Sequence, residues 1–230
     1  MRSISILQAV LFDCDGVIAD SEELWNEIDA ATLAHYGIPD YRGEHKEHVL
    51  GRSFALSVGF YRDFYSIAAP LDEIVEVRTQ IATQVYAERV PTYAGAAETL
   101  RELRSAGLKL ALATSSVSRL ILPFLKRCEI ERSFDVIVTG EMVKNGKPHP
   151  DIYLLAASKV ATRPSACLVV EDALAGLQAG RAAGALTVAI PDPRWMDPAA
   201  FAGEADYQVE RVADVVPLAR RLHGGAVSAA

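Results

Sequence analysis

The chain has few cysteines, no surplus of positive charge and no long apolar run, and each of these absences excludes a class of protein. Its three cysteines, Cys14, Cys128 and Cys167, form no C-x-x-C pair, so we expect neither a disulfide framework nor a zinc site. No apolar stretch reaches the roughly 18 residues of a membrane-spanning helix. The N-terminal apolar run is also too short for a secretory signal. These absences favour a cytoplasmic protein without a membrane partner.

The balance of charge is acidic, with 30 Asp and Glu against 23 Lys and Arg and a net charge of -7. Proteins that bind nucleic acid usually carry a basic stripe, and the sequence shows none. Half of the 230 residues are hydrophobic, which is typical of a globular protein with a sizeable core. We therefore expect no nucleic-acid partner.

Five short apolar segments predict the strands of a buried parallel sheet, because they lack the polar alternation of a half-exposed strand. They are Ala9–Phe12, Leu108–Ala113, Val136–Val138, Cys167–Val170 and Leu186–Ile190. Helical patterns lie between them, two of which (95–106 and 173–183) end at a glycine suited to a helix C-terminus. This alternation predicts an α/β fold with a doubly wound parallel sheet.

One connection is much longer than a crossover between parallel strands requires, since roughly 95 residues separate the first two strands. Three helical patterns fill it, at about 21–36, 53–65 and 71–89, and the first can be capped by Ser21. We therefore predict a catalytic core of residues 1–19 and 91–224, a helical cap domain of residues 20–90 and a disordered tail at 225–230.

Polar clusters follow four of the predicted strands, at the edge where ligands bind in open parallel sheets. They are Asp13 with Asp15, Thr114 with Ser115 and Ser116, Lys147, and Glu171 with Asp172. Each cluster alone has a simpler explanation, such as a helix cap, a metal-binding pair or an exposed turn. Together they supply the carboxylates, hydroxyls and lysine that handle a phosphate with a divalent cation.

The chemistry of a phosphate ester suggests a role for each of these residues. Asp13 would be the nucleophile, and Asp15 would protonate the leaving alcohol and then activate water. Lys147, Thr114 and the backbone amides around Ser115 would bind the phosphoryl oxygens. Mg²⁺ would be held by the carboxylates of Asp13 and Asp172 and by the backbone carbonyl of Asp15.

The motifs that carry these residues are Asp13–Ser21, Leu112–Ser115, Gly146–Asp151 and Val170–Gly176. In sequence and order they resemble the haloacid dehalogenase superfamily, in its group of β-phosphoglucomutases and sugar-phosphate phosphatases with a helical cap. The resemblance implies phosphoryl transfer through an aspartyl-phosphate, with Asp172 as a direct Mg²⁺ ligand and Glu171 as a ligand through water. It also implies a small phosphorylated metabolite, such as a sugar or polyol phosphate, as the substrate.

The resemblance leaves several alternatives to weigh. Dehalogenases lack an acid at the position of Asp15, and phosphonate hydrolases need a cap lysine where Phe54 stands. A phosphosugar mutase is the main rival, although the His and Arg expected in its cap appear here as Trp25 and Phe54. A receiver-like signalling module is disfavoured because it places its acidic pair before the phosphoacceptor.

The cap is expected to choose the substrate. Arg52 and Ser53 match a cap loop that approaches the active site in this family, where Arg52 would meet a hydroxyl or a second anionic group. A solvated Arg52 is an equal alternative. Trp25 would contact the substrate or fill the core of the cap, and the sequence favours the core.

Overall fold

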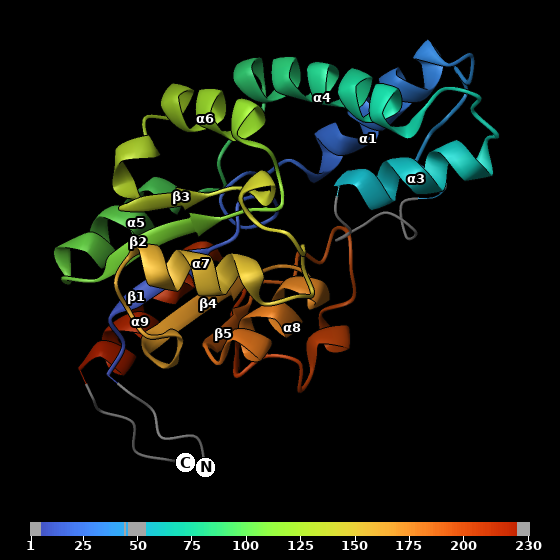
Figure 1. Ribbon diagram of the computed structural model, residues 1–230. Coiled ribbons are helices and arrows are strands. Elements are labelled where there is room, and N and C mark those ends of the chain that lie inside the picture. The colour runs from blue at the N-terminus through green and yellow to red at the C-terminus, as the bar shows by residue number, and fades with distance from the viewer. Residues whose placement is uncertain (1–5, 44, 46–53, 225–230) are drawn as a thin grey trace.

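A parallel sheet of six strands forms the centre of the computed structural model, which describes residues 6–43, 45 and 54–224 (Figure 1). The order across the sheet is β3-β2-β1-β4-β5-β6, and every neighbouring pair is parallel. The strands are β1 (Ala9–Phe12), β2 (Lys109–Ala113), β3 (Val136–Val138), β4 (Cys167–Glu171), β5 (Leu186–Ala189) and β6 (Tyr207–Gln208). The five predicted strands and the fold class are confirmed, and β6 is an addition at one edge.

Helices cover both faces of the sheet because alternate strand residues point to opposite sides. In β1, Val10 and Phe12 belong to one apolar core, and Ala9 and Leu11 belong to another. The first core includes residues of α5 (Ala96–Ser105), α6 (Ser118–Arg127) and α9 (Val215–His223). The second includes residues of α7 (Asp151–Lys159) and α8 (Leu174–Ala183). This two-sided burial explains why the strands show no polar alternation.

The order of the strands reverses at the centre of the sheet, and this reversal marks the expected ligand-binding edge. The chain passes from β1 to β2 and β3 on one side, then returns to β4 and β5 on the other. In such sheets the crevice lies beyond the carboxyl ends of the strands at the reversal. Here these are the ends of β1 and β4.

In the described part of the insertion after β1, three helices lie together at one end of the molecule, away from the sheet (Figure 1). These inserted helices are α1 (Glu22–His35), α3 (Phe54–Phe64) and α4 (Leu71–Glu88). Helix α4 packs against α6, where Arg119 forms two hydrogen bonds of 2.9 and 2.6 Å with Glu76. The predicted boundaries of a cap domain at 20–90 and a core at 1–19 and 91–224 stay predictions. The predicted tail at 225–230 lies outside the described residues.

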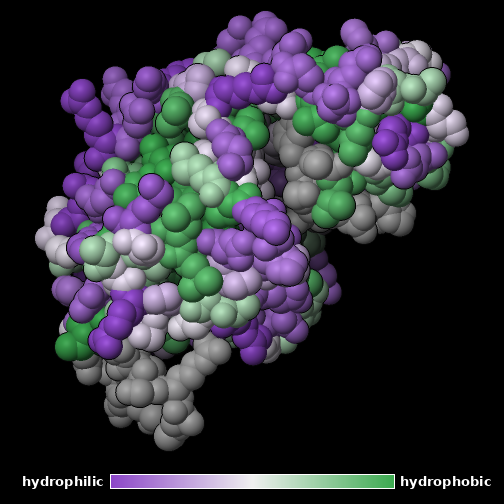
Figure 2. Space-filling model, viewed as in Figure 1, coloured by the Kyte–Doolittle hydropathy of each residue, from purple (hydrophilic) through white to green (hydrophobic). Residues whose placement is uncertain are grey.

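Helix α4 has 18 residues, with an exposed polar face and a buried face. Its exposed residues are all polar, and the molecular surface over it is largely hydrophilic (Figure 2). Ile74, Ala82 and Tyr86 are buried on the opposite face. Within the described part of the chain, no helix combines the length and apolar character needed to cross a membrane.

A buried ion pair joins the inserted helices to one another. Asp29 of α1 accepts hydrogen bonds from Arg78 of α4 at 2.7 Å and from Tyr61 of α3 at 2.8 Å. The side chains of Asp29 and Arg78 are only 5% and 7% exposed. Removing one partner from such a pair leaves a charge buried without compensation, which costs far more than losing a surface pair.

Replacing Asp29 by Ala should therefore lower the free energy of unfolding by about 3–5 kcal/mol, measured by urea denaturation. Asp29→Asn keeps an acceptor for Tyr61 and should be milder. Asp63→Asn on the exposed face of α3 is the matched control and should change stability by less than about 0.5 kcal/mol. If the Asp29→Ala variant were as stable as this control, the Asp29–Arg78 pair would contribute nothing to the free energy of unfolding.

Candidate active site

The predicted polar clusters meet at the carboxyl ends of the central strands. Asp13 directly follows β1, and its backbone N–H extends the sheet by donating to the Val170 carbonyl at 3.0 Å. Thr114 follows β2 and donates in the same way to Val138 at 3.0 Å. Glu171 is the last residue of β4 rather than the first residue after it, and Asp172 follows. Strand ladders thus fix the backbone of these residues.

Three carboxylates form a compact acidic group at this edge. Asp13, Glu171 and Asp172 each offer an oxygen, and these oxygens lie within 4.8 Å of one another. The residues are only 8%, 0% and 7% exposed, respectively. Buried charges of one sign repel each other strongly, so this group requires positive charge nearby.

The protonation equilibria of the acidic group reflect this burial. Burial raises the pKa of Asp13 to about 7, even though the positive charge of Lys147 acts in the opposite direction. Burial, together with the negative charges of Glu171 and Asp13, raises the pKa of Asp172 well above its usual value. A set of clustered oxygen ligands that is costly to ionise without a cation suits Mg²⁺. The residues present therefore fit the predicted metal.

Two glycines leave room for the acidic group. Gly16 has a positive φ of 76°, and a Cβ atom there would overlap the Asp172 carboxylate. Gly176, in the first turn of α8, lies so close to Glu171 that a Cβ atom would overlap its carboxylate as well. The glycines of the first and last motifs thus make space for two of the predicted ligands.

Lys147 supplies one positive charge to this group from the loop between β3 and α7. Its Nζ lies 2.7 Å from Asp13 Oδ1 and 2.6 Å from Glu171 Oε1. Burial by itself lowers the pKa of Lys147, but the charges of Asp13 and Glu171 outweigh it and hold this pKa well above its usual value. The lysine is therefore charged and faces the nucleophile candidate.

Tyr153 of α7 supports both Lys147 and Glu171. Its hydroxyl donates a hydrogen bond to Glu171 Oε1, and its ring centroid lies 5.3 Å from Lys147 Nζ. The ring is fully buried. A hydrogen bond to one carboxylate oxygen restricts the rotation of the Glu171 side chain.

The carboxylate of Asp15 is held by three hydroxyl groups from different parts of the chain. Ser21 donates to Oδ1 at 2.8 Å, and Ser116 donates to Oδ2 at 2.9 Å. Tyr86 of α4 also donates to Oδ1. One bond thus comes from the segment before α1, one from the loop after β2 and one from the inserted helices.

The predicted capping role of Ser21 is wrong. Ser21 occupies the position before α1, but its side chain makes no capping hydrogen bond. The hydroxyl turns toward Asp15 instead. A bond to a carboxylate is stronger than a bond to a neutral backbone amide, which explains this preference.

The hydroxyl cluster after β2 forms a tight turn beside Asp15. Thr114 is buried, and its Oγ1 accepts a hydrogen bond from the backbone N–H of Ser116 at 3.1 Å. Ser115 lies between them at the same edge of the sheet and is partly exposed. Gly140 approaches so closely that a Cβ atom would overlap the Ser115 carbonyl. The turn is therefore fixed on two sides.

The residues predicted to contact the substrate from the insertion are only partly described. Trp25 of α1 packs against Tyr86, with ring centroids 5.5 Å apart, and the Arg78 guanidinium lies 4.6 Å from the Trp25 ring. Arg52 and Ser53 lie outside the described residues, as does the side chain of Phe54.

Tyr86 and Tyr153 were not among the predicted site residues. Both lie on helices among apolar residues, where an aromatic side chain normally indicates packing. The one signal for Tyr153 is its place six residues after Lys147, in the first turn of the next helix. Tyr86 has no comparable signal.

Similarity to known proteins identifies the family of this chain. A family model described as haloacid dehalogenase-like hydrolase matches residues 10–190. The phosphorylated carbohydrates phosphatase of Thermotoga maritima is 34% identical over 77% of this chain and 82% of its own length.

Two solved structures extend the similarity over more of the chain. CbbY from Rhodobacter sphaeroides, in complex with phosphate, has a TM-score of 0.80 and 29% identity. The match covers 91% of this chain and 96% of the CbbY chain. A putative β-phosphoglucomutase from Thermotoga maritima has a TM-score of 0.74 and 30% identity. The match covers 92% of this chain and 98% of the mutase chain. The chain therefore belongs to the haloacid dehalogenase-like hydrolase family, in which it is a phosphatase.

Proposed function

We propose that the chain is a Mg²⁺-dependent phosphatase of small phosphorylated metabolites, with sugar or polyol phosphates as substrates. The observation that carries the proposal is the position of Asp13. Its carboxylate belongs to the buried acidic group and lies 2.7 Å from the Lys147 ammonium. This arrangement can neutralise an incoming phosphoryl group beside a carboxylate nucleophile.

In the first step, a carboxylate oxygen of Asp13 attacks phosphorus and forms an aspartyl-phosphate. The bond between phosphorus and the ester oxygen breaks, and Asp15 gives its proton to that oxygen. Lys147, the Thr114 hydroxyl and the backbone amides around Ser115 bind the phosphoryl oxygens. In the second step, Asp15 takes a proton from water, which attacks phosphorus and releases phosphate from Asp13.

Asp13, Asp172 and the backbone carbonyl of Asp15 would hold Mg²⁺, with Glu171 as a ligand through water. When bound, Mg²⁺ supplies positive charge that lowers the repulsion between the phosphoryl group and Asp13. The fit rests on the clustered buried oxygens of the acidic group.

The inserted helices are proposed to act as a cap, residues 20–90, that chooses the substrate. Tyr86 of α4 already reaches Asp15, so this helix lies close enough to the reacting groups to contact a small substrate. Arg52, Ser53 and Trp25 are the proposed contacts. The name of the Thermotoga maritima phosphatase supports a phosphorylated carbohydrate as the substrate.

A phosphosugar mutase is the second candidate, because one similar structure is that of a putative β-phosphoglucomutase. Trp25 stands where the cap histidine of such a mutase is expected, and its ring packs against Tyr86. We therefore expect no conversion of glucose 1-phosphate to glucose 6-phosphate in the presence of a bisphosphate activator. Conversion faster than phosphate release would favour the mutase.

A screen of sugar, polyol and nucleotide phosphates for released phosphate tests the proposed function. Activity should depend on added Mg²⁺ and fall by at least about 100-fold in EDTA, because the acidic group otherwise repels the substrate. Added Mg²⁺ should restore it, and Ca²⁺, which is larger and more flexibly coordinated, should restore less. Undiminished activity in EDTA would contradict the metal role, and continuous turnover would exclude a receiver-like module.

A further inference from the structure

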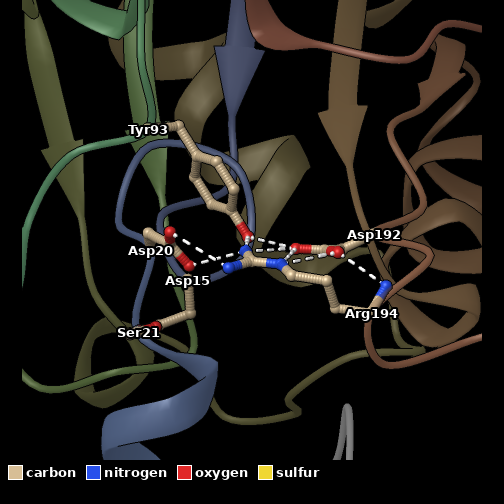
Figure 3. A network of polar contacts seen from close by, with 6 residues as sticks. All are labelled: Asp15, Asp20, Ser21, Tyr93, Asp192 and Arg194. Carbon is tan, nitrogen blue, oxygen red and sulfur yellow. Dashed lines mark hydrogen bonds and ion pairs between the residues drawn. The ribbon is translucent and has the colours of Figure 1, made fainter.

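One loop holds both segments that connect the inserted helices to the sheet (Figure 3). The loop is 191–197, one residue beyond β5, and the connecting segments are 18–21 and 90–93. Arg194 donates to Asp20 of the first segment at 2.8 Å, and Asp192 accepts from the Tyr93 hydroxyl of the second at 2.9 Å. Arg194 and Asp192 are themselves joined by hydrogen bonds of 2.5 to 3.0 Å. The loop thus contacts both segments through one charged pair.

The two connecting segments are also bonded to each other. Ala19 and Thr92 form an antiparallel bridge. The Asp20 N–H donates to the Pro91 carbonyl at 3.0 Å, and the Tyr93 N–H donates to the Ile18 carbonyl at 2.9 Å. A displacement of one segment therefore moves the other, and the Arg194 contact acts on both.

The first connecting segment leads directly to the proposed general acid and base. Ser21, which follows Asp20, donates to Asp15 Oδ1 at 2.8 Å. Ser21 is fully buried, so its hydroxyl has little freedom once the backbone is fixed. In Figure 3, Arg194, Asp20, Ser21 and Asp15 lie close together at the start of the insertion.

We propose that Arg194 is a positioning residue for the proposed phosphatase reaction: it fixes the backbone at Asp20, and through Ser21 it directs the carboxylate of Asp15. The proposal rests on the proposed function. In this proposal Arg194 influences the reaction through the segment 18–21 and does not itself contact the reacting groups.

Loss of the Arg194–Asp20 ion pair should affect the stability of the fold and the rate of the reaction to different extents. Arg194 and Asp20 are 49% and 28% exposed, so their ion pair contributes little to the stability of the fold. A misplaced general acid, in contrast, slows a reaction strongly, because proton transfer requires close contact with the leaving oxygen. Loss of the contact should therefore change the rate much more than the stability.

Two esters with different leaving groups distinguish a positioning role of Arg194 from a general loss of activity. Arg194→Ala should lower kcat/KM about tenfold for an alkyl phosphate, whose alkoxide needs the proton of Asp15. For p-nitrophenyl phosphate, whose nitrophenolate leaves without a proton, the loss should be less than about twofold. The ratio kcat/KM is suitable because it includes steps only up to departure of the alcohol. Ser21→Ala should show the same dependence on the leaving group.

The matched control is Arg101→Ala, which removes an exposed arginine paired with Glu98 on α5 and should change neither rate. A loss in Arg194→Ala that is equal for both esters, or no loss for either, would overturn the proposal.

A second measurement is independent of turnover. Amide hydrogen exchange in residues 15–21 should become about tenfold faster in Arg194→Ala than in the wild type, while exchange in β2 stays the same. Unchanged exchange would also overturn the role of Arg194. If the wild-type chain hydrolyses neither ester, the proposed function fails, and the exchange experiment still decides whether Arg194 holds the connecting segment.

Discussion

Asp13→Asn should abolish turnover, lowering kcat on the best substrate by at least about 10⁴-fold. An amide oxygen is a poor nucleophile, so no aspartyl-phosphate can form at this position. The change is nearly isosteric, and the Asn Oδ1 can still accept the hydrogen bond that Lys147 now donates at 2.7 Å. The loss should therefore reflect chemistry rather than folding. Release of inorganic phosphate is the measurement.

Two further experiments separate the loss of the nucleophile from other causes. Asp63→Asn makes the same substitution on an exposed side chain of α3 and should keep wild-type activity. Mass spectrometry of the wild type, quenched in acid during turnover, should find a phosphoryl group on Asp13. Wild-type turnover by Asp13→Asn would show that another residue is the nucleophile.

Asp15→Asn should lower kcat by about 10²–10⁴-fold, because an amide can neither protonate the leaving alcohol nor take a proton from water. The fold should tolerate the change. The three groups around Asp15 are the hydroxyls of Ser21, Tyr86 and Ser116, and a hydroxyl can rotate to accept from the new amide as well as donate. The loss should thus be a loss of proton transfer.

The two steps of the reaction should respond differently in this variant. With p-nitrophenyl phosphate, which needs no proton for departure, Asp15→Asn should still form the aspartyl-phosphate and then hydrolyse it slowly. A burst of nitrophenolate, followed by accumulation of phosphorylated protein, is the expected signature. A variant that hydrolyses an alkyl phosphate at the wild-type rate would contradict the role of Asp15.

The predicted and observed elements differ for identifiable reasons. β1 and β3 have the predicted bounds, because their residues are continuously apolar. Helix α6, for which no bounds were predicted, contains Pro123, a residue that normally argues against a helix interior. β6 has only two residues, so it offers no periodicity at all. Tertiary packing, rather than local preference, stabilises these two elements.

The sequence by itself determined the parallel sheet, the insertion after the first strand and the types of side chain at the edge of the sheet. It could do so because burial on both faces leaves continuous apolar runs, and the residue after each run is then at the carboxyl edge. The family and the acidic group around Asp13 follow from the same motifs.

Only the tertiary structure decided which side chains support the site. Tyr86 reaches Asp15 across 71 positions of sequence, and Arg194 reaches Asp20 across 174. Each contact depends on how α4 or the loop after β5 packs. No local sequence pattern predicts a contact between residues so far apart in the chain. The hydroxyl of Ser21 illustrates the same limit, because its sequence context predicts a helix cap. A nearby carboxylate, brought in by the fold, offers it a stronger hydrogen bond.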